Sequence, residues 1–255
     1  VDPIRAELSS DNPYPDLGVG GGAGLGSLVY GLTRVGTILG ESRYVDLACE
    51  AAALIDDARL QADKTYDVLR GAAGAILGLL TAYDARGSDM LLEQACAAGD
   101  RLLNAAIVDD DNRWFWRTIQ PEPLYGVSHG VGGIGYALAR LAARPDDDSY
   151  WSAARSAFAF EHAGYDETLH SWPDRRAGTP FESTSGWCTG ADGVALTRLD
   201  LLQRGATAGL DETQLRNDFD RALAATVDTP GQFDGGLCDR DHLCCGTFGR
   251  VALYR

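Results

Sequence analysis

The chain has 255 residues, of which 45% are hydrophobic, and this length can bury one large core or two modest ones. Its formal net charge is −15, with 37 acidic and 22 basic residues and a single lysine, Lys64. This balance argues against nucleic acid as a partner, because phosphates need a basic surface. No run of 18 or more apolar residues occurs, so no membrane span is expected. An acid-rich, lysine-poor surface also suits a salt-adapted protein, and that question stays open.

Helical periodicity begins after a polar, glycine- and proline-rich lead-in over residues 6–23. A nearly charge-free helix is predicted from Gly24 to about Val35, followed by an amphipathic helix over about 43–61. The contrast between the two indicates an inner helix and an outer one. Further charge-poor runs begin at four later glycine steps, at Gly71, Gly130, Gly190 and Gly246.

The first three of these runs are each followed by a predicted amphipathic partner. The apolar faces of the three partners carry Leu92, Cys96, Gly99 and Leu103; Tyr150, Ala154, Ala157 and Phe158; and Leu215, Phe219, Leu223 and Val227. The run that begins at Gly246 is short, because the chain stops at Arg255.

The four glycine steps are 59, 60 and 56 residues apart. A fixed period of helix pairs is typical of repeat architectures, and no strand alternation of useful length is present. The sequence therefore predicts an all-α fold, an α/α toroid in which outer helices wrap a ring of inner ones. The glycines would lie where neighbouring backbones crowd together. We expect residues 1–255 to be a domain fragment that lacks terminal helical repeats, and part of a longer protein, since the chain does not begin with Met.

Long connections lead to the motif-bearing helix starts, at about 108–125, 164–186 and 228–243. Connections of this length usually carry function. Because each one ends at a candidate motif, the motifs are expected to share one rim of the ring.

The six cysteines do not indicate the disulfide framework of a small secreted domain, because the chain is far longer than such scaffolds and nothing in these residues marks it as secreted. We expect a cytoplasmic protein. Cys49 and Cys96 lie in alanine-rich apolar segments, which favours small buried hydrophobic roles.

Three cysteines stand directly before predicted helix starts: Cys188 in Trp187-Cys188-Thr189-Gly190, and Cys244 and Cys245 in Cys244-Cys245-Gly246. A helix N-terminus lowers the pKa of a thiol, and thiolate sulfur is a preferred zinc ligand. These three residues are therefore predicted to bind Zn²⁺, with a fourth position open for water or for a substrate thiol. Three thiolates make the metal centre electron-rich, which favours thiolate addition over hydrolysis. A closed, structural site with Cys238 or His242 as fourth ligand is the alternative.

Two further residues are candidates for proton transfer. His129 lies at the start of an otherwise apolar inner helix, and a neutral imidazole there could take a thiol proton or deliver one to a carbanion. Asp67, four residues before Gly71, could orient that histidine or relay protons, or could serve only as a capping or loop carboxylate. His162 and His170 have no comparable position.

The ordered set of motifs resembles the cyclases of lanthipeptide biosynthesis. The motifs run along nearly the whole chain, as Asp67-Val68-Leu69-x-Gly71-x-x-Gly74, Ser128-His129-Gly130-x-x-Gly133, Trp187-Cys188-x-Gly190-x-x-Gly193 and Cys244-Cys245-Gly246-x-x-Gly249. Gly24-Leu25-Gly26-Ser27-Leu28 and Trp172-Pro173-Asp174 are most similar to the C-terminal cyclase domain of class II lanthipeptide synthetases.

The resemblance implies zinc ligation by Cys188, Cys244 and Cys245, as in a Cys-Cys-Gly branch with an all-cysteine site, with His129 as acid/base and Asp67 as its conserved aspartate. It also implies addition of peptide cysteine thiols to dehydroalanine or dehydrobutyrine, which closes lanthionine or methyllanthionine rings. The implied partners are a dehydrated precursor peptide with its leader and an upstream dehydratase domain. Thr184 and Thr189 occupy positions where stand-alone cyclases have an assisting arginine and tyrosine, so those two roles do not carry over.

Two other functions stay open. One is a transferase that adds glutathione to dehydroamino acids on the same scaffold. The other is a non-catalytic toroid in which zinc only stabilises the rim and a groove binds peptides. A glycan-acting α/α barrel is disfavoured, because no carboxylate pair beside an aromatic cleft is evident.

Overall fold

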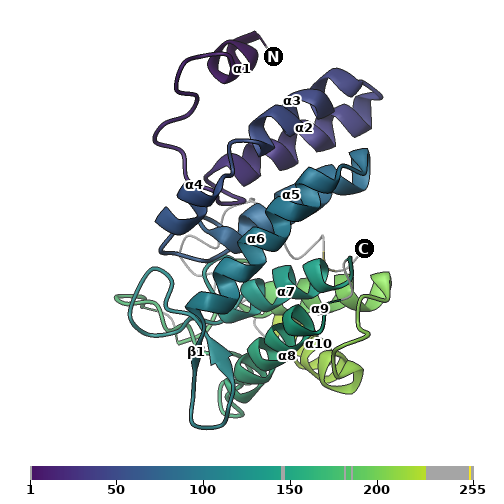
Figure 1. Cartoon of the computed structure of the whole chain (residues 1–255). Helices are drawn as coiled ribbons and strands as arrows, with labels where there is room; N and C mark the ends of the chain where they lie inside the picture. The colour runs from purple at the N-terminus through teal and green to yellow at the C-terminus, as the bar shows by residue number, and fades with distance from the viewer. Residues whose placement is uncertain (1, 145–146, 181, 185, 228–252, 254–255) are drawn as a thin grey trace. The chain divides into compact units, whose positions relative to one another are not determined.

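The computed structural model describes residues 2–144, 147–180, 182–184, 186–227 and 253 (Figure 1). The chain divides into two compact units, Val1–Ala105 and Ala106–Arg255, and each is described by itself. The first unit contains six helices in its described part: α1 (Asp2–Leu8), α2 (Leu25–Leu39), α3 (Ser42–Ala52), α4 (Asp57–Ala62), α5 (Ala72–Arg86) and α6 (Asp89–Ala105). The second contains, among its described residues, a short strand pair and four helices: β1 (Ile107–Val108), β2 (Trp114–Phe115), α7 (Val131–Ala142), α8 (Asp148–Ala163), α9 (Ala191–Arg204) and α10 (Glu212–Val227).

The predicted helix couplets are present in both units. Helix α2 packs on α3 and α5 on α6 in the first unit, while α7 packs on α8 and α9 on α10 in the second. Within each unit the two inner helices also pack on each other, α2 on α5 and α7 on α9. The predicted glycine steps are the N-caps of these four helices, at Gly24, Gly71, Gly130 and Gly190. The step at Gly246 lies outside the described residues.

Glycines allow α2 and α5 to approach closely, as the sequence predicts. A β-carbon built on Gly78 would lie 2.5 Å from the carbonyl oxygen of Gly26, and one on Gly74 would lie 2.1 Å from the backbone nitrogen of Gly21. Real β-carbons do not come that near to backbone atoms, so a larger residue at either position would force the segments apart. Because these glycines have no side chain, the inner helices α2 and α5 can pack with their backbones close together.

Helix α2 differs from the other inner helices, because part of its apolar surface is exposed. Tyr30 is 49% exposed, Val35 42%, Ile38 73% and Leu39 57%. Helices α5 and α7, by contrast, bury most of their length. Among the described residues, no helix has both the length and the apolar character needed to cross a bilayer.

Three predictions about individual elements are wrong in detail. The outer helix predicted over 43–61 is two helices, because Asp56 caps the start of α4 by accepting a 2.8 Å hydrogen bond from the Arg59 N–H. The lead-in over 6–23 begins in helix α1. The connection over 108–125 contains part of the β1–β2 hairpin, in which Ile107 pairs with Phe115.

The buried face of α6 is displaced by one residue from the predicted one. The buried residues are Leu91, Ala95, Ala98, Gly99 and Leu102. Leu92, Cys96 and Leu103, predicted to face inward, are only half-buried. Apolar residues stand side by side at 91–92, 95–96 and 102–103, so periodicity alone does not distinguish the two faces.

Candidate functional site

The loop before α7 and the loop before α9 are joined by backbone hydrogen bonds. The carbonyl oxygen of Cys188 accepts from the N–H of Val127 at 3.1 Å and from the N–H of Ser128 at 2.9 Å. Ser128 is buried and directly precedes His129, the predicted acid/base residue. The structure therefore brings the segment that carries His129 against the segment that carries the predicted zinc ligand Cys188.

Gly126 makes this contact possible. Its φ of +88° is in the left-handed region, which glycine adopts without penalty. A β-carbon on Gly126 would lie 2.6 Å from Thr189 Cα and 2.9 Å from the Cys188 carbonyl oxygen. Any other residue would therefore separate the two loops. Gly126 is thus part of the site architecture, although the sequence motif begins only at Ser128.

His129 is half-buried, one residue before the Gly130 N-cap of α7. Its backbone carbonyl accepts a 2.7 Å hydrogen bond from the Thr118 hydroxyl, which ties the long 108–125 connection to this loop. Backbone bonds from Val131 N–H to Leu124 at 2.9 Å and from Gly133 N–H to Gly126 at 3.1 Å complete the turn into the helix. Hydrogen bonds from Thr118, Val131 and Gly133 thus fix the backbone of the loop that carries the His129 imidazole.

Cys188 is half-buried, two residues before the Gly190 N-cap of α9. Its sulfur is in a disulfide, and the other cysteine of that bond lies outside the described residues. The remaining predicted ligands, Cys244 and Cys245, and the alternative fourth ligands, Cys238 and His242, also lie outside them. Within the part of the chain that the structure describes, no three histidine, cysteine, aspartate or glutamate side chains are grouped to hold a metal ion.

The two threonines that replace the assisting arginine and tyrosine form a pair. The hydroxyl oxygens of Thr184 and Thr189 are 3.1 Å apart, and Thr189 is buried beside Cys188. The Thr184 carbonyl also accepts from the Ala191 N–H at 3.3 Å, at the first turn of α9. These residues hold the Cys188 loop in shape and supply neither a positive charge nor a phenol.

A fully buried ionic cluster lies behind the His129 loop. Glu161 of α8, Arg198 of α9 and Asp218 of α10 are all 0% exposed. Arg198 Nη2 is 2.7 Å from Glu161 Oε2 and 3.2 Å from Asp218 Oδ2. The half-buried His162 places Nδ1 2.5 Å from Asp218 Oδ1. The cluster therefore connects three helices of the second unit through charged groups.

Glu161 also reaches the candidate site directly. Its Oε1 accepts a 2.8 Å hydrogen bond from the Gly126 N–H. Burial raises the pKa of Glu161 above its ordinary value, while the charge of Arg198 and the Gly126 N–H act in the opposite direction. Glu161 was not among the residues predicted from the sequence, although the sequence contains a signal for it. It continues the buried face of α8, three residues after Phe158, and a carboxylate at such a position needs a partner.

Asp67, the second predicted catalytic residue, belongs to the first unit and is fully buried. Its carboxylate accepts a 2.7 Å hydrogen bond from the Arg70 N–H, and its carbonyl accepts from the N–H groups of Gly71 at 3.0 Å and Gly74 at 3.2 Å. Asp67 therefore stabilises the turn that leads into α5, which is consistent with the predicted loop-carboxylate role and leaves a chemical role untested.

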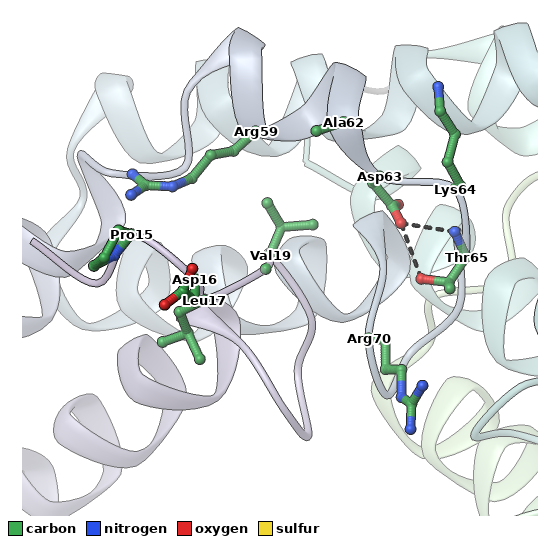
Figure 2. A pocket seen from close by; sticks show the side chains of 11 residues that line it. Pro15, Asp16, Leu17, Val19, Arg59, Ala62, Asp63, Lys64, Thr65 and Arg70 are labelled. Atoms are coloured by element: carbon green, nitrogen blue, oxygen red, sulfur yellow. Dashed lines mark hydrogen bonds between the residues drawn. The ribbon is translucent and has the colours of Figure 1, made fainter.

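A pocket of about 440 Å³ is lined by lead-in residues 15–19, by Arg59 and residues 62–65, and by Arg70 (Figure 2). Two of the charged residues in its wall, Arg59 and Asp63, hydrogen-bond to the nearby backbone. Arg59 donates to the carbonyls of Leu54, Pro13 and Tyr14 at 2.8, 3.1 and 3.3 Å, and Asp63 accepts from Thr65 N–H and Ala72 N–H, each at 2.8 Å. Asp67 does not line the pocket.

Cys49 and Cys96, predicted to be small buried hydrophobic residues, are half-buried and take part in no disulfide. Burial raises the pKa of the Cys49 thiol, so it is less nucleophilic than an exposed thiol.

Comparison with known proteins decides the family. The family profile described as lanthionine synthetase C-like protein matches residues 1–255. The chain belongs to the lanthionine synthetase C-like family. The resemblance in its motifs is thereby confirmed. A search of the curated proteins finds no match.

Solved structures agree with this family assignment at the level of the fold. The chain is similar to nisin cyclase with a TM-score of 0.64 at 16% identity, over 98% of this chain and 72% of that one. It is also similar to a variant of UGL with dGlcA-Glc-Rha-Glc, with a TM-score of 0.51 at 14% identity, over 87% of this chain and 64% of that one. Both are α/α toroids, so the predicted all-α, α/α-toroid fold class is confirmed.

Proposed function

We propose that this lanthionine synthetase C-like chain is a cyclase domain that closes thioether rings in a ribosomally made peptide. A cysteine thiol of the peptide would add to dehydroalanine or dehydrobutyrine to give lanthionine or methyllanthionine. The observation that carries the proposal is the pair of hydrogen bonds from Val127 and Ser128 to the Cys188 carbonyl. They support a shared site for a soft sulfur ligand and a proton-transfer group, which is what thiol addition to an alkene requires.

The proposed metal ligands are Cys188, Cys244 and Cys245. A disulfide at Cys188 means that a second sulfur lies next to it, and a reduced pair of thiols is a donor set that suits zinc. Bound zinc would supply an anionic, nucleophilic thiolate from the peptide cysteine at neutral pH. Because the thiols must be reduced to bind metal, we place the protein in the cytoplasm.

His129 is the proposed acid/base. The reaction forms one carbon–sulfur bond and breaks the π bond of the dehydroamino acid, whose electron pair moves to give an enolate. The proton lost from the thiol is returned to Cα, so the peptide mass does not change. His129 would take or deliver that proton at a ring nitrogen. For Asp67 we propose an orienting role toward this proton transfer, secondary to its hydrogen bond with Arg70.

The proposed partner is a dehydrated precursor peptide with its leader, and we place this chain within a class II synthetase whose upstream dehydratase domain makes the alkenes. The motifs Gly24-Leu25-Gly26-Ser27-Leu28 and Trp172-Pro173-Asp174 support this assignment.

The decisive experiment uses the reduced, zinc-supplied protein with a dehydrated peptide that carries one cysteine. Ring closure is followed by mass spectrometry after thiol alkylation, because a closed ring leaves no thiol to alkylate. His129→Asn should lower the rate by about 10²- to 10⁴-fold, the range expected for loss of a general acid/base. His170→Asn is the matched control, because His170 is exposed on the surface, and it should leave the rate unchanged.

The same assay separates the alternatives. Glutathione added to the peptide would increase its mass by one glutathione, whereas an internal ring adds no mass. Peptide binding without either product, and zinc retained in the His129→Asn protein, would indicate a non-catalytic, zinc-stabilised toroid. Either result would overturn the cyclase proposal.

A further inference from the structure

The buried Glu161 carboxylate is the contact between the ionic cluster and the loop that carries His129. One oxygen, Oε1, accepts the 2.8 Å hydrogen bond from the Gly126 N–H, and the other, Oε2, is paired with Arg198 at 2.7 Å. Gly126 in turn lies against Thr189 and the Cys188 carbonyl. Glu161 therefore binds the residue directly before Val127, whose N–H bonds to the Cys188 loop. The recorded hydrogen bond and ion pair of its carboxylate are to Gly126 and Arg198, and not to His129 or Cys188.

The surroundings of Glu161 are built to fit its carboxylate. A β-carbon on Gly132, in the first turn of α7, would lie 2.2 Å from Glu161 Oε2, so a larger residue there would displace the carboxylate. The indole Nε1 of Trp172 donates a 2.7 Å hydrogen bond to the Glu161 backbone carbonyl, which fixes the helix at this residue. Both the side chain and the backbone of Glu161 are thus held against the start of α7.

Such an arrangement is energetically demanding. A fully buried carboxylate is costly unless it is paired and hydrogen-bonded, and a buried ion pair is often no more stabilising than apolar residues of the same volume. A contribution to the free energy of folding is therefore a weak explanation for the Glu161–Arg198–Asp218 cluster. Without Glu161, the buried Gly126 N–H would lose this acceptor, three residues before His129.

We propose that Glu161 is a positioning residue, which fixes the Gly126–His129 loop against the Cys188 loop, and that its ion pair with Arg198 holds its carboxylate in place. The expected effect on ring closure rests on the proposed function. The structural part, the order of the loop, is independent of it.

Asp218 provides a matched control, because it is equally buried and is paired with the same guanidinium, 3.2 Å from Arg198. Within the described part of the chain its carboxylate contacts Arg198 and His162, and not the Gly126 loop. Glu161→Gln and Asp218→Asn each remove one negative charge from Arg198. Both should lower the melting temperature. Glu161→Asp is a third variant, which keeps the charge but shortens the reach toward Gly126.

The first measurement is hydrogen exchange of the backbone amides of residues 126–128 in the whole protein. Exchange should be faster, by at least about tenfold, in Glu161→Gln and Glu161→Asp, and unchanged in Asp218→Asn, while the central amides of α7 stay protected in all three. A purely stabilising role would raise exchange equally in Glu161→Gln and Asp218→Asn, and that result would overturn the proposal.

The second measurement is ring closure per mole of folded protein, below the melting temperature of every variant. The two Glu161 variants should lose kcat by about tenfold or more with KM little changed, and Asp218→Asn should stay within about threefold of the parent. If the parent itself closes no rings, the proposed function fails while the exchange result still decides the role of Glu161. Equal kcat losses in Glu161→Gln and Asp218→Asn would contradict positioning.

Discussion

The backbone N–H of Ser128 donates a 2.9 Å hydrogen bond to the carbonyl of Cys188, across 60 residues of sequence. Together with the bond from Val127, it joins the predicted acid/base segment to the predicted metal-binding segment. Chemistry that uses both groups depends on this backbone contact, because a misplacement of about 1 Å can lower a rate by roughly 100-fold.

The Gly126 contact can be tested by adding one methyl group. Gly126→Ala introduces a β-carbon 2.6 Å from Thr189 Cα at a φ of +88°, so the loops must separate. We expect ring closure to fall by about 100-fold with helical circular dichroism retained. Gly178→Ala is the control, because its φ is +76° but no atom lies within 4 Å of the added carbon. Equal activity losses in both variants would show that backbone strain, and not loop contact, is responsible.

The approach of α2 and α5 predicts opposite effects for two alanine substitutions. Gly78→Ala places a β-carbon 2.5 Å from the Gly26 carbonyl and should lower the free energy of unfolding by about 1–3 kcal/mol. Gly31→Ala, inside α2 with nothing within 4 Å, should raise it by about 0.5–1 kcal/mol, because alanine loses less backbone entropy in a helix. Urea denaturation measures both. A Gly78→Ala protein as stable as the parent would contradict the close approach.

Tyr136 should titrate later than an ordinary tyrosine. Burial, together with the nearby Asp200 carboxylate, raises its pKa to about 12, while Arg140 acts in the opposite direction. A folded-state pKa above the unfolded value of 10.0 means that this contribution to stability is complete below pH 10 and is lost as the pH rises toward 12. Tyr136→Phe should remove one late phase from the ultraviolet titration of the folded protein. A difference spectrum that titrates near pH 10 would contradict the assignment.

The proposed metal site predicts a measurable zinc content. The reduced protein should hold about one zinc ion per chain, and Cys188→Ala and Cys245→Ala should each lower that content below half. Cys49→Ala is the control, since Cys49 is a free, half-buried thiol on α3. Chelation should abolish ring closure, and zinc should restore it. Full zinc content in Cys188→Ala would exclude Cys188 as a ligand.

Helix order and pairing follow from local features of the sequence. Each described glycine step became the N-cap of an inner helix, because the charge-poor run that follows it buries apolar surface by packing on the neighbouring helices. The ends of individual helices and the choice of their buried faces were less predictable from the sequence. Asp56 interrupts a continuous apolar pattern by capping α4, and the adjacent apolar pairs in α6 leave its buried face ambiguous by one residue.

The sequence by itself determined the family, the fold class and the residue types at the candidate site, because motifs and hydrophobic periods are local properties. Only the tertiary structure decided that Cys188 bonds to the Ser128 segment and that Glu161, Arg198 and Asp218 meet behind it. Nothing in the spacing of these residues predicts their contact. A buried charge takes its role from the partners that packing brings to it, and those partners come from three different helices.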